Sequence, residues 1–261
     1  MQVVITESAD EVADLSADAI EALLHRKPDA ILGVATGSSP VGTYDELGRR
    51  VAAGKISLAR ASAFMLDEYV GLPAGHRESY RSVIQQIFAG KVDIDPDRVH
   101  GPDGASADIP SACTAYEQAI VEAGGIDLQL LGVGSDGHIA FNEPSSSLGS
   151  RTRIKTLTRQ TRLDNSRFFG GDLDAVPTHC LTQGIATILE ARRIVLVATG
   201  RSKAEAIHHT VEGALSAMWP GSALQLHPDV TVILDTAAGS RLQLVDYYRE
   251  VWNNKPSWQG W

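Results

Sequence analysis

The segment from Asp136 to Glu143 concentrates the side chains that are best suited to proton transfer. Two carboxylates, Asp136 and Glu143, bracket His138 on a turn that is rich in glycine. An imidazole that is oriented by carboxylates exchanges protons near neutral pH, where a general acid–base catalyst is most effective. A lone histidine on a polar turn is usually just solvated, but a cluster of three ionisable groups favours catalysis. We therefore expect this segment to carry acid–base chemistry.

Another carboxylate, Asp67, comes directly after an apolar run, in the sequence Asp67-Glu68-Tyr69. One acidic residue at the end of a strand is more commonly a helix cap than a catalyst. Opposite an anion site and an Asp/His/Glu cluster, however, it fits the role of a base that removes a proton from carbon. Both interpretations stay open from these residues alone.

Two similar turns predict an anion site. They are TGSSP at 36–40 and TGRSK at 199–203, and each is followed by a helical stretch. Gly37 permits tight backbone geometry, and we expect Ser38 or Ser39 to cap the first helix. Exposed N–H groups at a helix N-terminus attract phosphate, and Lys203 adds a cation. Taken alone, each segment fits an ordinary strand-to-helix turn as well as it fits an anion site. Two such turns together with a lysine favour an anionic ligand.

Neither a nucleotide site nor a metal site is predicted, and we expect no cofactor. The G-x-G-x-x-G pattern that begins at Gly132 is followed almost at once by Pro144, and the region beyond is basic where a dinucleotide site needs an acidic residue. His208 and His209 lack a carboxylate at metal-ligand spacing, which is typical of a helix surface. The two cysteines are too few for a disulfide framework or a cysteine-based zinc site.

The composition excludes several classes of protein. The chain has 261 residues, of which 43% are hydrophobic, with 23 Lys and Arg against 32 Asp and Glu and hence a net charge of −9. Such an acidic chain is a poor general nucleic-acid binder, because phosphate backbones are bound mainly by clustered Lys and Arg. No apolar run approaches the ~18–20 residues of a membrane-spanning helix. The N-terminus lacks the basic and apolar regions of a secretory signal, so we expect a cytoplasmic protein.

Short apolar runs alternate with small-residue turns and helical stretches along the chain. We expect strands at 30–35, 61–66, 127–133, 193–198 and 230–234, with helices at 41–53 and from the second anion turn to residue 217. Near-continuous apolar runs suit strands covered on both faces, and the helices suit right-handed crossovers. The expected fold is one α/β domain over residues 1–261, an open, mostly parallel, Rossmann-like sheet with helices on both faces. Ligands of such sheets bind beyond the carboxyl ends of the strands, where the polar segments above lie.

Several longer motifs occur in an order and spacing that resemble the glucosamine-6-phosphate deaminase family over nearly the whole chain. They are ATGSSP at 35–40, MLDEYVGL at 65–72, GVGSDGHIAFNEP at 132–144, SLGSRTRIKTLT at 147–158, NSRFF at 165–169 and LQLHP at 224–228. The resemblance implies a modified open α/β sheet without a metal or an organic cofactor. It also implies isomerisation and hydrolytic deamination of D-glucosamine 6-phosphate to D-fructose 6-phosphate and ammonia, in amino-sugar catabolism.

The resemblance also implies roles for individual residues. Asp67 would move a proton between C2 and C1 of the sugar through an enolamine. His138 would open the pyranose ring, and Asp136 and Glu143 would complete its proton relay. The substrate phosphate would be bound by backbone, hydroxyl and cationic groups of Gly37, Ser38, Ser39, Arg167 and Lys203.

A second ligand site is implied as well. Some members of the family are hexamers that N-acetylglucosamine 6-phosphate activates at a subunit interface, so a homo-oligomer is expected. Ser146, Arg153 and Lys155 match the hydroxyl and basic positions of that site, although the same residues also suit an exposed basic strand. The match is incomplete near the C-terminus, where Arg249 stands in place of a ligand-binding tyrosine and Tyr248 is its neighbour.

Two further segments are predicted to lie outside the core. Residues 158–177, which contain Arg167, correspond to a mobile lid of the family, and the pair Gly170-Gly171 suits a hinge. The C-terminal tail contains Trp252, Trp258 and Trp261, and the sequence does not decide between an interface and a disordered end.

Two other functions compete with deamination. Sheets of this kind also carry 6-phosphogluconolactonase activity, with a GxGxDGHxASLFP-type loop that resembles residues 132–144; the FNEP ending here and the separate LDEY motif favour the deaminase. The alternative without catalysis is a sugar-phosphate sensor. A sensor would require an attached DNA-binding module, whereas only a short helix separates Met1 from the first core strand.

Overall fold

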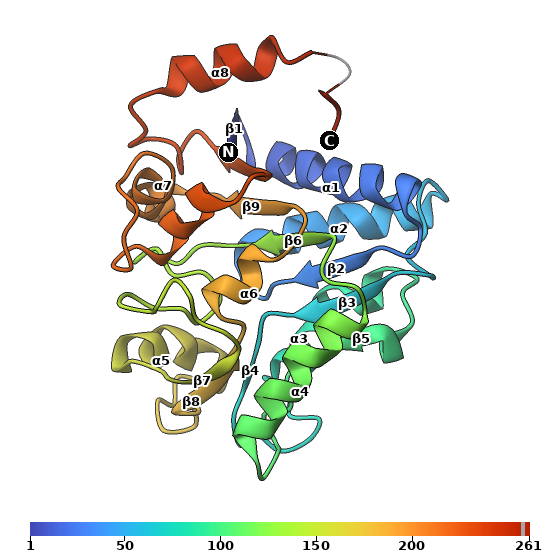
Figure 1. Cartoon of the computed structure of the whole chain (residues 1–261), viewed down its shortest axis with the longest axis vertical. Helices are drawn as coiled ribbons and strands as arrows, with labels where there is room; N and C mark the ends of the chain where they lie inside the picture. Colours follow the sequence, from blue (N-terminus) through green and yellow to red (C-terminus); the bar gives the residue numbers. More distant parts are fainter. Residues whose placement is uncertain (257–258) are drawn as a thin grey trace.

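A seven-stranded parallel sheet forms the centre of the molecule (Figure 1). The computed structural model describes residues 1–256 and 259–261, so Trp258 of the C-terminal tail lies outside the described residues. The strand order is β1-β10-β9-β6-β2-β3-β5, and every neighbouring pair is parallel. The strands are β1 (Gln2–Thr6), β2 (Ile31–Val34), β3 (Ser62–Met65), β5 (Val99–His100), β6 (Leu128–Leu131), β9 (Ile194–Ala198) and β10 (Val230–Asp235).

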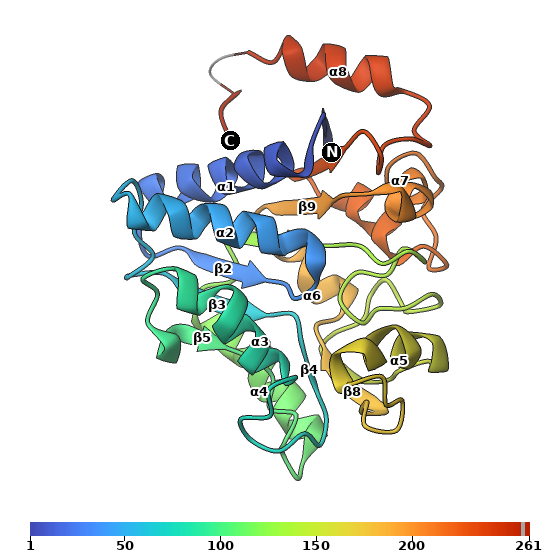
Figure 2. The same cartoon turned by 180° about the vertical axis from the view of Figure 1, so that it is seen from behind.

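Helices cover both faces of this sheet (Figures 1 and 2). One face packs against α1 (Ala9–Arg26), α2 (Ser38–Ala52) and α3 (Tyr80–Ile87). The other face packs against α4 (Ile109–Glu122), α6 (Ile185–Leu189) and α7 (Ala204–Val211). Helix α8 (Val245–Asn253) runs beside β1 at one edge. Short 3-10 turns complete the set at Ala89–Lys91, Pro96–Arg98, Arg167–Phe169, Arg201–Lys203 and Pro220–Leu226.

Alternating side chains of the central strands fill two separate cores. Leu32 and Val34 of β2 pack on the side of α1 and α2, whereas Ile31 packs on the side of α4. All residues of β2, β6 and β9 are buried, because both faces of these strands are covered. This arrangement explains the near-continuous apolar runs in the sequence, and it confirms the predicted open α/β sheet with helices on both faces.

A second, smaller sheet was not predicted. It is antiparallel, in the order β4-β8-β7, and consists of β4 (Asp67–Tyr69), β8 (His179–Thr182) and β7 (Arg153–Thr156). Only Leu66 separates the end of β3 from the start of β4, so the chain passes from one sheet into the other at Asp67. A pattern of neighbouring residues cannot reveal pairing with a strand that lies so far along the chain.

Two helix predictions were wrong in detail. The first helix begins at Ser38 rather than residue 41; its N-cap is Gly37, with φ of 108°, and no described side chain caps it. The predicted serine cap is therefore absent, because both serines are already helical. The second helix ends at Val211 rather than residue 217, since the N–H groups of Glu212 and Gly213 both turn back to the carbonyl of His208.

Candidate active site

Three of the predicted segments leave neighbouring strands at one edge of the large sheet. Residues 35–40 follow β2, residues 132–144 follow β6, and residues 199–203 follow β9. These strands are adjacent in the order β9-β6-β2. From β2 the chain proceeds outward to β3 and β5, and after β6 it proceeds in the opposite direction. The segments therefore meet at the point where the strand order reverses, which is where open α/β sheets bind ligands.

His138 and Asp136 form a close pair in the loop after β6. The Nδ1 atom of His138 lies 2.6 Å from Oδ1 of Asp136, and the backbone N–H of His138 donates to the same oxygen at 3.2 Å. No other described residue makes a hydrogen bond to Nδ1 of His138, so Asp136 is the group that this atom faces. Gly134 is required here, because a Cβ atom would lie 2.2 Å from the imidazole ring. Gly137 adopts φ of 81°, which is unfavourable for other residues.

This pairing has consequences for both side chains. Burial works to raise the pKa of Asp136, but the contact with His138 and its charge outweigh burial and leave the pKa below its ordinary value. Asp136 is therefore ionised at neutral pH. Its position on the Nδ1 side leaves Nε2 of His138 as the atom for proton exchange, and 32% of this side chain is exposed to solvent. The pair can act as a proton shuttle.

Glu143 is buried, but its partners differ from those predicted. Its Oε1 atom accepts hydrogen bonds from Thr158 at 3.4 Å and from Thr161. Within the described residues, no hydrogen bond or ion pair joins Glu143 to His138. The structure thus brings Asp136 and His138 together, and it places Glu143 against the start of α5 (Arg159–Ser166).

Asp67 is buried at the first position of β4, opposite Thr182 of β8. Among the described residues, no hydrogen bond reaches its carboxylate. Burial, and then the charge of Glu68, raises the pKa of Asp67 well above its ordinary value. The charges of Asp67 and Glu143 both act on the buried thiol of Cys180, where they add to the effect of burial in raising its pKa. Both carboxylates therefore act on one buried group of the small sheet.

Lys203 and Arg167 come together from distant parts of the chain. Burial lowers the pKa of Lys203, the charge of Arg167 lowers it further, and the charges of Asp136 and Asp164 oppose the shift. The charges of Lys203, Arg167 and Asp136 therefore influence one another. Arg167 is exposed, with its guanidinium carbon 4.7 Å from the ring centre of Phe168. Two cations in this position can bind a phosphate.

The N-terminus of α2 adds hydrogen-bond donors at the same edge. The first N–H groups of a helix have no acceptor within the helix, and no described side chain caps them here. Gly37 and Gly200 adopt similar conformations, with φ of 108° and 86°, so the two turns are alike in structure as well as in sequence. The N–H of Gly200, however, is bound at 3.0 Å by both carboxylate oxygens of Asp235. In the first turn, no described side chain binds the N–H groups of Ser38 and Ser39, so both can donate to a ligand.

The residues predicted for a second ligand site lie on and near the small sheet. Arg153 and Lys155 are half-buried and project from the same face of β7. Ser146 is buried, and its hydroxyl has no hydrogen-bond partner among the described residues. Arg249 and Tyr248 lie on α8, at the opposite end of the molecule from β7 (Figures 1 and 2). Within one chain, these C-terminal residues are therefore remote from Arg153 and Lys155 on β7 (Figure 1).

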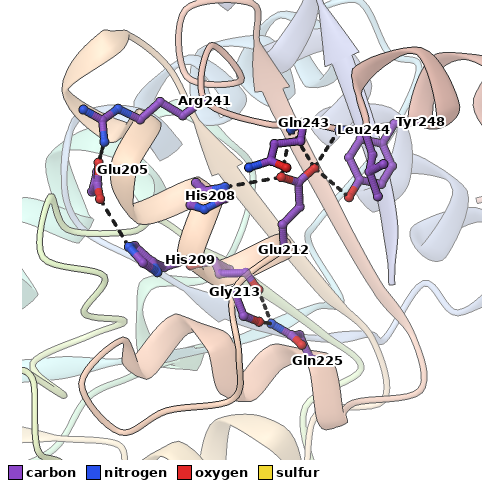
Figure 3. Close-up of polar contacts among 11 residues, drawn as sticks. Glu205, His208, His209, Glu212, Gly213, Gln225, Arg241, Gln243, Leu244 and Tyr248 are labelled. Atoms are coloured by element: carbon purple, nitrogen blue, oxygen red, sulfur yellow. Dashed lines mark hydrogen bonds and ion pairs between the residues drawn. The ribbon is translucent and has the colours of Figure 1, made fainter.

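The paired histidines lie partly exposed on helix α7, as predicted, but the predicted lack of nearby carboxylates was wrong. Each contacts a carboxylate one helical turn away: His208 Nδ1 lies 3.3 Å from Glu212, and His209 Nε2 lies 3.2 Å from Glu205 (Figure 3). The ring of His209 also stacks on Trp219, with centroids 3.9 Å apart. The described part of the chain contains no group of three or more His, Cys, Asp or Glu side chains placed to hold a metal ion.

Sequence reasoning missed several residues around the predicted site. Thr158 and Thr161 bind Glu143, and Gln183 lies directly after Thr182, the partner of Asp67. Gln183 directly follows β8, a strand of mixed polar and apolar residues, so no residue pattern pointed to it. The partners of the threonines could not be inferred, because hydroxyl residues near a helix start are common caps.

Known proteins resemble this chain in sequence and in fold. Residues 5–233 match the family described as glucosamine-6-phosphate isomerases/6-phosphogluconolactonase. The chain is 66% identical to a glucosamine-6-phosphate deaminase of Mycolicibacterium smegmatis and 65% identical to one of Beutenbergia cavernae, each over 260 residues and 100% of both proteins. No helix among the described residues is long and apolar enough to span a bilayer.

Two solved structures define the structural relationship. A monomeric glucosamine-6-phosphate deaminase is 41% identical, with a TM-score of 0.89 over 92% of this chain and 100% of that chain. The 6-phosphogluconolactonase of Trypanosoma cruzi is 20% identical, with a TM-score of 0.73 over 93% of this chain and 97% of that chain. The second similarity shows a shared fold alone.

Proposed function

The chain belongs to the glucosamine-6-phosphate isomerase/6-phosphogluconolactonase family, and we propose that it is a glucosamine-6-phosphate deaminase. It converts D-glucosamine 6-phosphate and water to D-fructose 6-phosphate and ammonia, a step of amino-sugar catabolism. Relatives that are 65% and 66% identical over the full chain carry the deaminase name, whereas the lactonase is only 20% identical. We also propose that the enzyme is cytoplasmic and that it takes part in the degradation of N-acetylglucosamine.

The observation that carries this proposal is the presence of two separate acid–base groups at one sheet edge. Asp67 is buried without a hydrogen bond from any described residue, and His138 is paired with Asp136 and partly open to solvent. Lactone hydrolysis has no need of a base that moves a proton between carbon atoms, but isomerisation of an amino sugar does. The arrangement therefore supports deamination.

The two groups divide the chemistry between them. His138 transfers a proton between the ring oxygen and O1, which opens the pyranose to the C1 aldehyde. Asp67 then removes the proton from C2 while O1 is protonated, which forms an enolamine, and it returns a proton to C1. The product carries an iminium at C2. Water adds to this carbon, and ammonia leaves as the C2 ketone forms.

The phosphate end of the substrate is bound away from the reacting carbons. We assign it to Lys203, Arg167 and the uncapped start of α2, where Gly37, Ser38 and Ser39 lie. Binding energy from this remote group orients C1 and C2 against Asp67. The distance between the phosphate and the reacting carbons explains why cations and carboxylates are needed at separate points of one edge.

We propose that residues 158–177 act as a lid over the substrate. The segment contains Arg167, and Gly170 and Gly171 at its centre have φ of 68° and 84°. Its first residues, Thr158 and Thr161, contact Glu143. Movement of the segment would therefore change both a phosphate contact and the surroundings of a proposed catalytic carboxylate, which suits a lid that closes when substrate binds.

The deciding experiment is a direct assay of both activities on the purified protein. We expect release of ammonia from D-glucosamine 6-phosphate, in equal amount to D-fructose 6-phosphate, and no hydrolysis of 6-phosphogluconolactone above the spontaneous rate. Lactone hydrolysis without ammonia release would show that the lactonase alternative is correct. Binding of the sugar phosphate without turnover of either substrate would instead indicate a sensor.

We further propose that Ser146, Arg153 and Lys155 bind N-acetylglucosamine 6-phosphate in a homo-oligomer, as in the hexameric members of the family. The unpartnered buried hydroxyl of Ser146 and the two basic side chains on one face of β7 support an anionic ligand. A monomeric relative, 41% identical, makes the oligomeric state the critical measurement. Solution mass should exceed that of one chain, and N-acetylglucosamine 6-phosphate should lower KM. A monomer that does not respond would overturn this proposal.

A further inference from the structure

A buried pair of side-chain amides connects the two segments that carry the proposed acid–base groups. Asn142 and Gln183 are fully buried, and neither has a part in the chemistry above. Asn142 lies in the turn that follows His138, and Gln183 directly follows β8. A primary amide donates two hydrogen bonds and accepts others, so its partners reveal what it holds in place.

Asn142 attaches the His138 loop to the small sheet. Its Nδ2 atom donates to the carbonyl of Ile139 at 3.1 Å and to the carbonyl of Gln183 at 2.8 Å. The first bond closes a tight turn in which Ala140 adopts φ of 51°, an uncommon conformation for a residue with a side chain. The second bond reaches the residue after β8. The loop therefore cannot shift without breaking bonds to that strand.

Gln183 continues the connection toward Asp67. Its Nε2 atom donates to the carbonyl of Met65 at 3.0 Å, and its backbone N–H donates to the carbonyl of Leu66 at 2.8 Å. Met65 and Leu66 are the two residues that precede Asp67. One buried residue thus contacts both the backbone that presents Asp67 and, through its own carbonyl, the side chain of Asn142.

We propose that Asn142 and Gln183 are positioning residues that set the separation between Asp67 and His138. This inference rests on the proposed deaminase function. Neither residue reaches the substrate; each acts by holding a catalytic segment. Displacement of a reacting group by about 1 Å can slow catalysis by roughly 100-fold, so small shifts of either segment matter.

The unsatisfied acceptors of this pair support a positioning role. Oδ1 of Asn142 and Oε1 of Gln183 are buried without a hydrogen-bond partner among the described residues. Burial of an unpaired carbonyl oxygen is unfavourable, and apolar side chains of similar size would avoid it. An apolar pair would stabilise the fold more, but it could not donate hydrogen bonds to the two catalytic segments. The presence of amides therefore favours a role in holding these segments.

A matched pair of glutamine substitutions tests this inference. Gln129 of β6 is also fully buried, and its Nε2 donates to the carbonyl of Leu130 at 2.9 Å. Among the described residues, its Oε1 has no hydrogen-bond partner, and its side chain makes no hydrogen bond to either catalytic segment. Gln183→Met and Gln129→Met should lower the melting temperature similarly. Only Gln183→Met should lower kcat, by about tenfold or more, with KM changed less than about threefold. Equal losses of kcat in the two variants would overturn the proposal.

A second variant keeps the proposal testable if Gln183→Met does not fold. In Asn142→Asp, an ionised carboxylate cannot donate to the Ile139 and Gln183 carbonyls, whereas its protonated form can donate to one of them. The kcat of Asn142→Asp relative to wild type should therefore rise as the pH falls, while that of Asn142→Leu should not. A ratio that is independent of pH in both variants would refute the positioning role. Wild-type protein that releases no ammonia would instead refute the proposed function itself.

Discussion

The carboxylates of Asp67 and Glu68 lie on opposite faces of strand β4 and have different surroundings. Glu68 points toward α3 and accepts backbone hydrogen bonds from Tyr69 and Tyr80 at 2.8 Å and from Arg81 at 2.9 Å. Asp67 points to the other face, and no hydrogen bond from the described residues reaches its carboxylate. Both side chains are buried. Within the described part of the chain, backbone N–H groups have replaced water around Glu68, but not around Asp67.

Glu68 caps the start of helix α3. Its carboxylate binds the first two N–H groups of this helix, and the hydroxyl of Ser79 binds the N–H of Ser82 at 3.2 Å. These groups are the ones that a helix leaves without acceptors. Burial raises the pKa of Glu68, but the three N–H bonds oppose the shift. Among the described residues, no hydrogen bond opposes the effect of burial on the pKa of Asp67. Glu68 therefore stabilises the fold, whereas Asp67 has few hydrogen-bond donors around it and can take up a proton.

Asp67→Asn should have the largest effect on catalysis. The amide preserves the shape of the side chain but cannot accept a proton from carbon, so kcat should fall by about 1,000-fold, while substrate binding should change little. Ammonia release and equilibrium binding of the substrate measure the two quantities. Activity within tenfold of wild type would show that Asp67 is not the base.

Glu68→Ala should have the largest effect on stability. Loss of three bonds to a charged acceptor, two of them at a helix N-terminus, should reduce the free energy of unfolding by about 3 kcal/mol. Urea unfolding measures this loss, and Ser79→Ala, which removes one bond from the same helix start, should cost about 1 kcal/mol. A larger loss in Ser79→Ala would contradict the role assigned to Glu68.

Asp67→Asn should also make the protein more stable, in contrast to Glu68→Ala. Because the pKa of Asp67 is raised in the folded state, its contribution to stability is present below the unfolded pKa and is lost as the pH rises through the folded pKa. The variant avoids that loss, so its advantage should grow with pH to about 1–2 kcal/mol. Urea midpoints for both proteins at pH 5 and pH 8 test this; an advantage that shrinks toward pH 8 would be inconsistent with a raised pKa.

The smallest effect is expected from Glu68→Gln on the pH profile. The charge of Glu68 contributes to the raised pKa of Asp67, so its removal should move the acid limb of kcat/KM to lower pH. Glu46→Gln is the control, because Glu46 is a buried carboxylate that pairs with Arg50 in α2 at 2.7 Å. A shift of the acid limb to higher pH, or the same shift in Glu46→Gln, would show that titration of Asp67 does not set this limb.

Five of the seven strands of the large sheet, all except β1 and β5, could be predicted because an apolar run marks each of them in the sequence. Residues 31–34 and 194–198 are free of polar side chains, four of the six residues at 230–235 are apolar, and turns with small residues follow these strands. A strand covered on both faces must be apolar at nearly every position, so its burial is visible in its own residues. The position of the His138 loop followed from the same reasoning, since loops after parallel strands share one edge.

The surroundings of the candidate site could be predicted only in part. The close pairing of His138 with Asp136 is a contact within one turn, and their spacing indicated it. The partners of Glu143 come from α5, and the connection from Asn142 to Met65 passes through Gln183. These contacts depend on how separate segments pack, and no residue type identifies them in advance.

The sequence by itself determined which strands form the core, which edge carries the polar loops and, through its motifs, the family to which the chain belongs. Tertiary structure alone decided that Asp67 faces away from available donors while Glu68 meets the start of α3. Hydrophobic burial acts through the composition of each segment, so it can be read along the chain. The protonation of a buried carboxylate depends on which distant groups replace its water, and only the folded arrangement sets that.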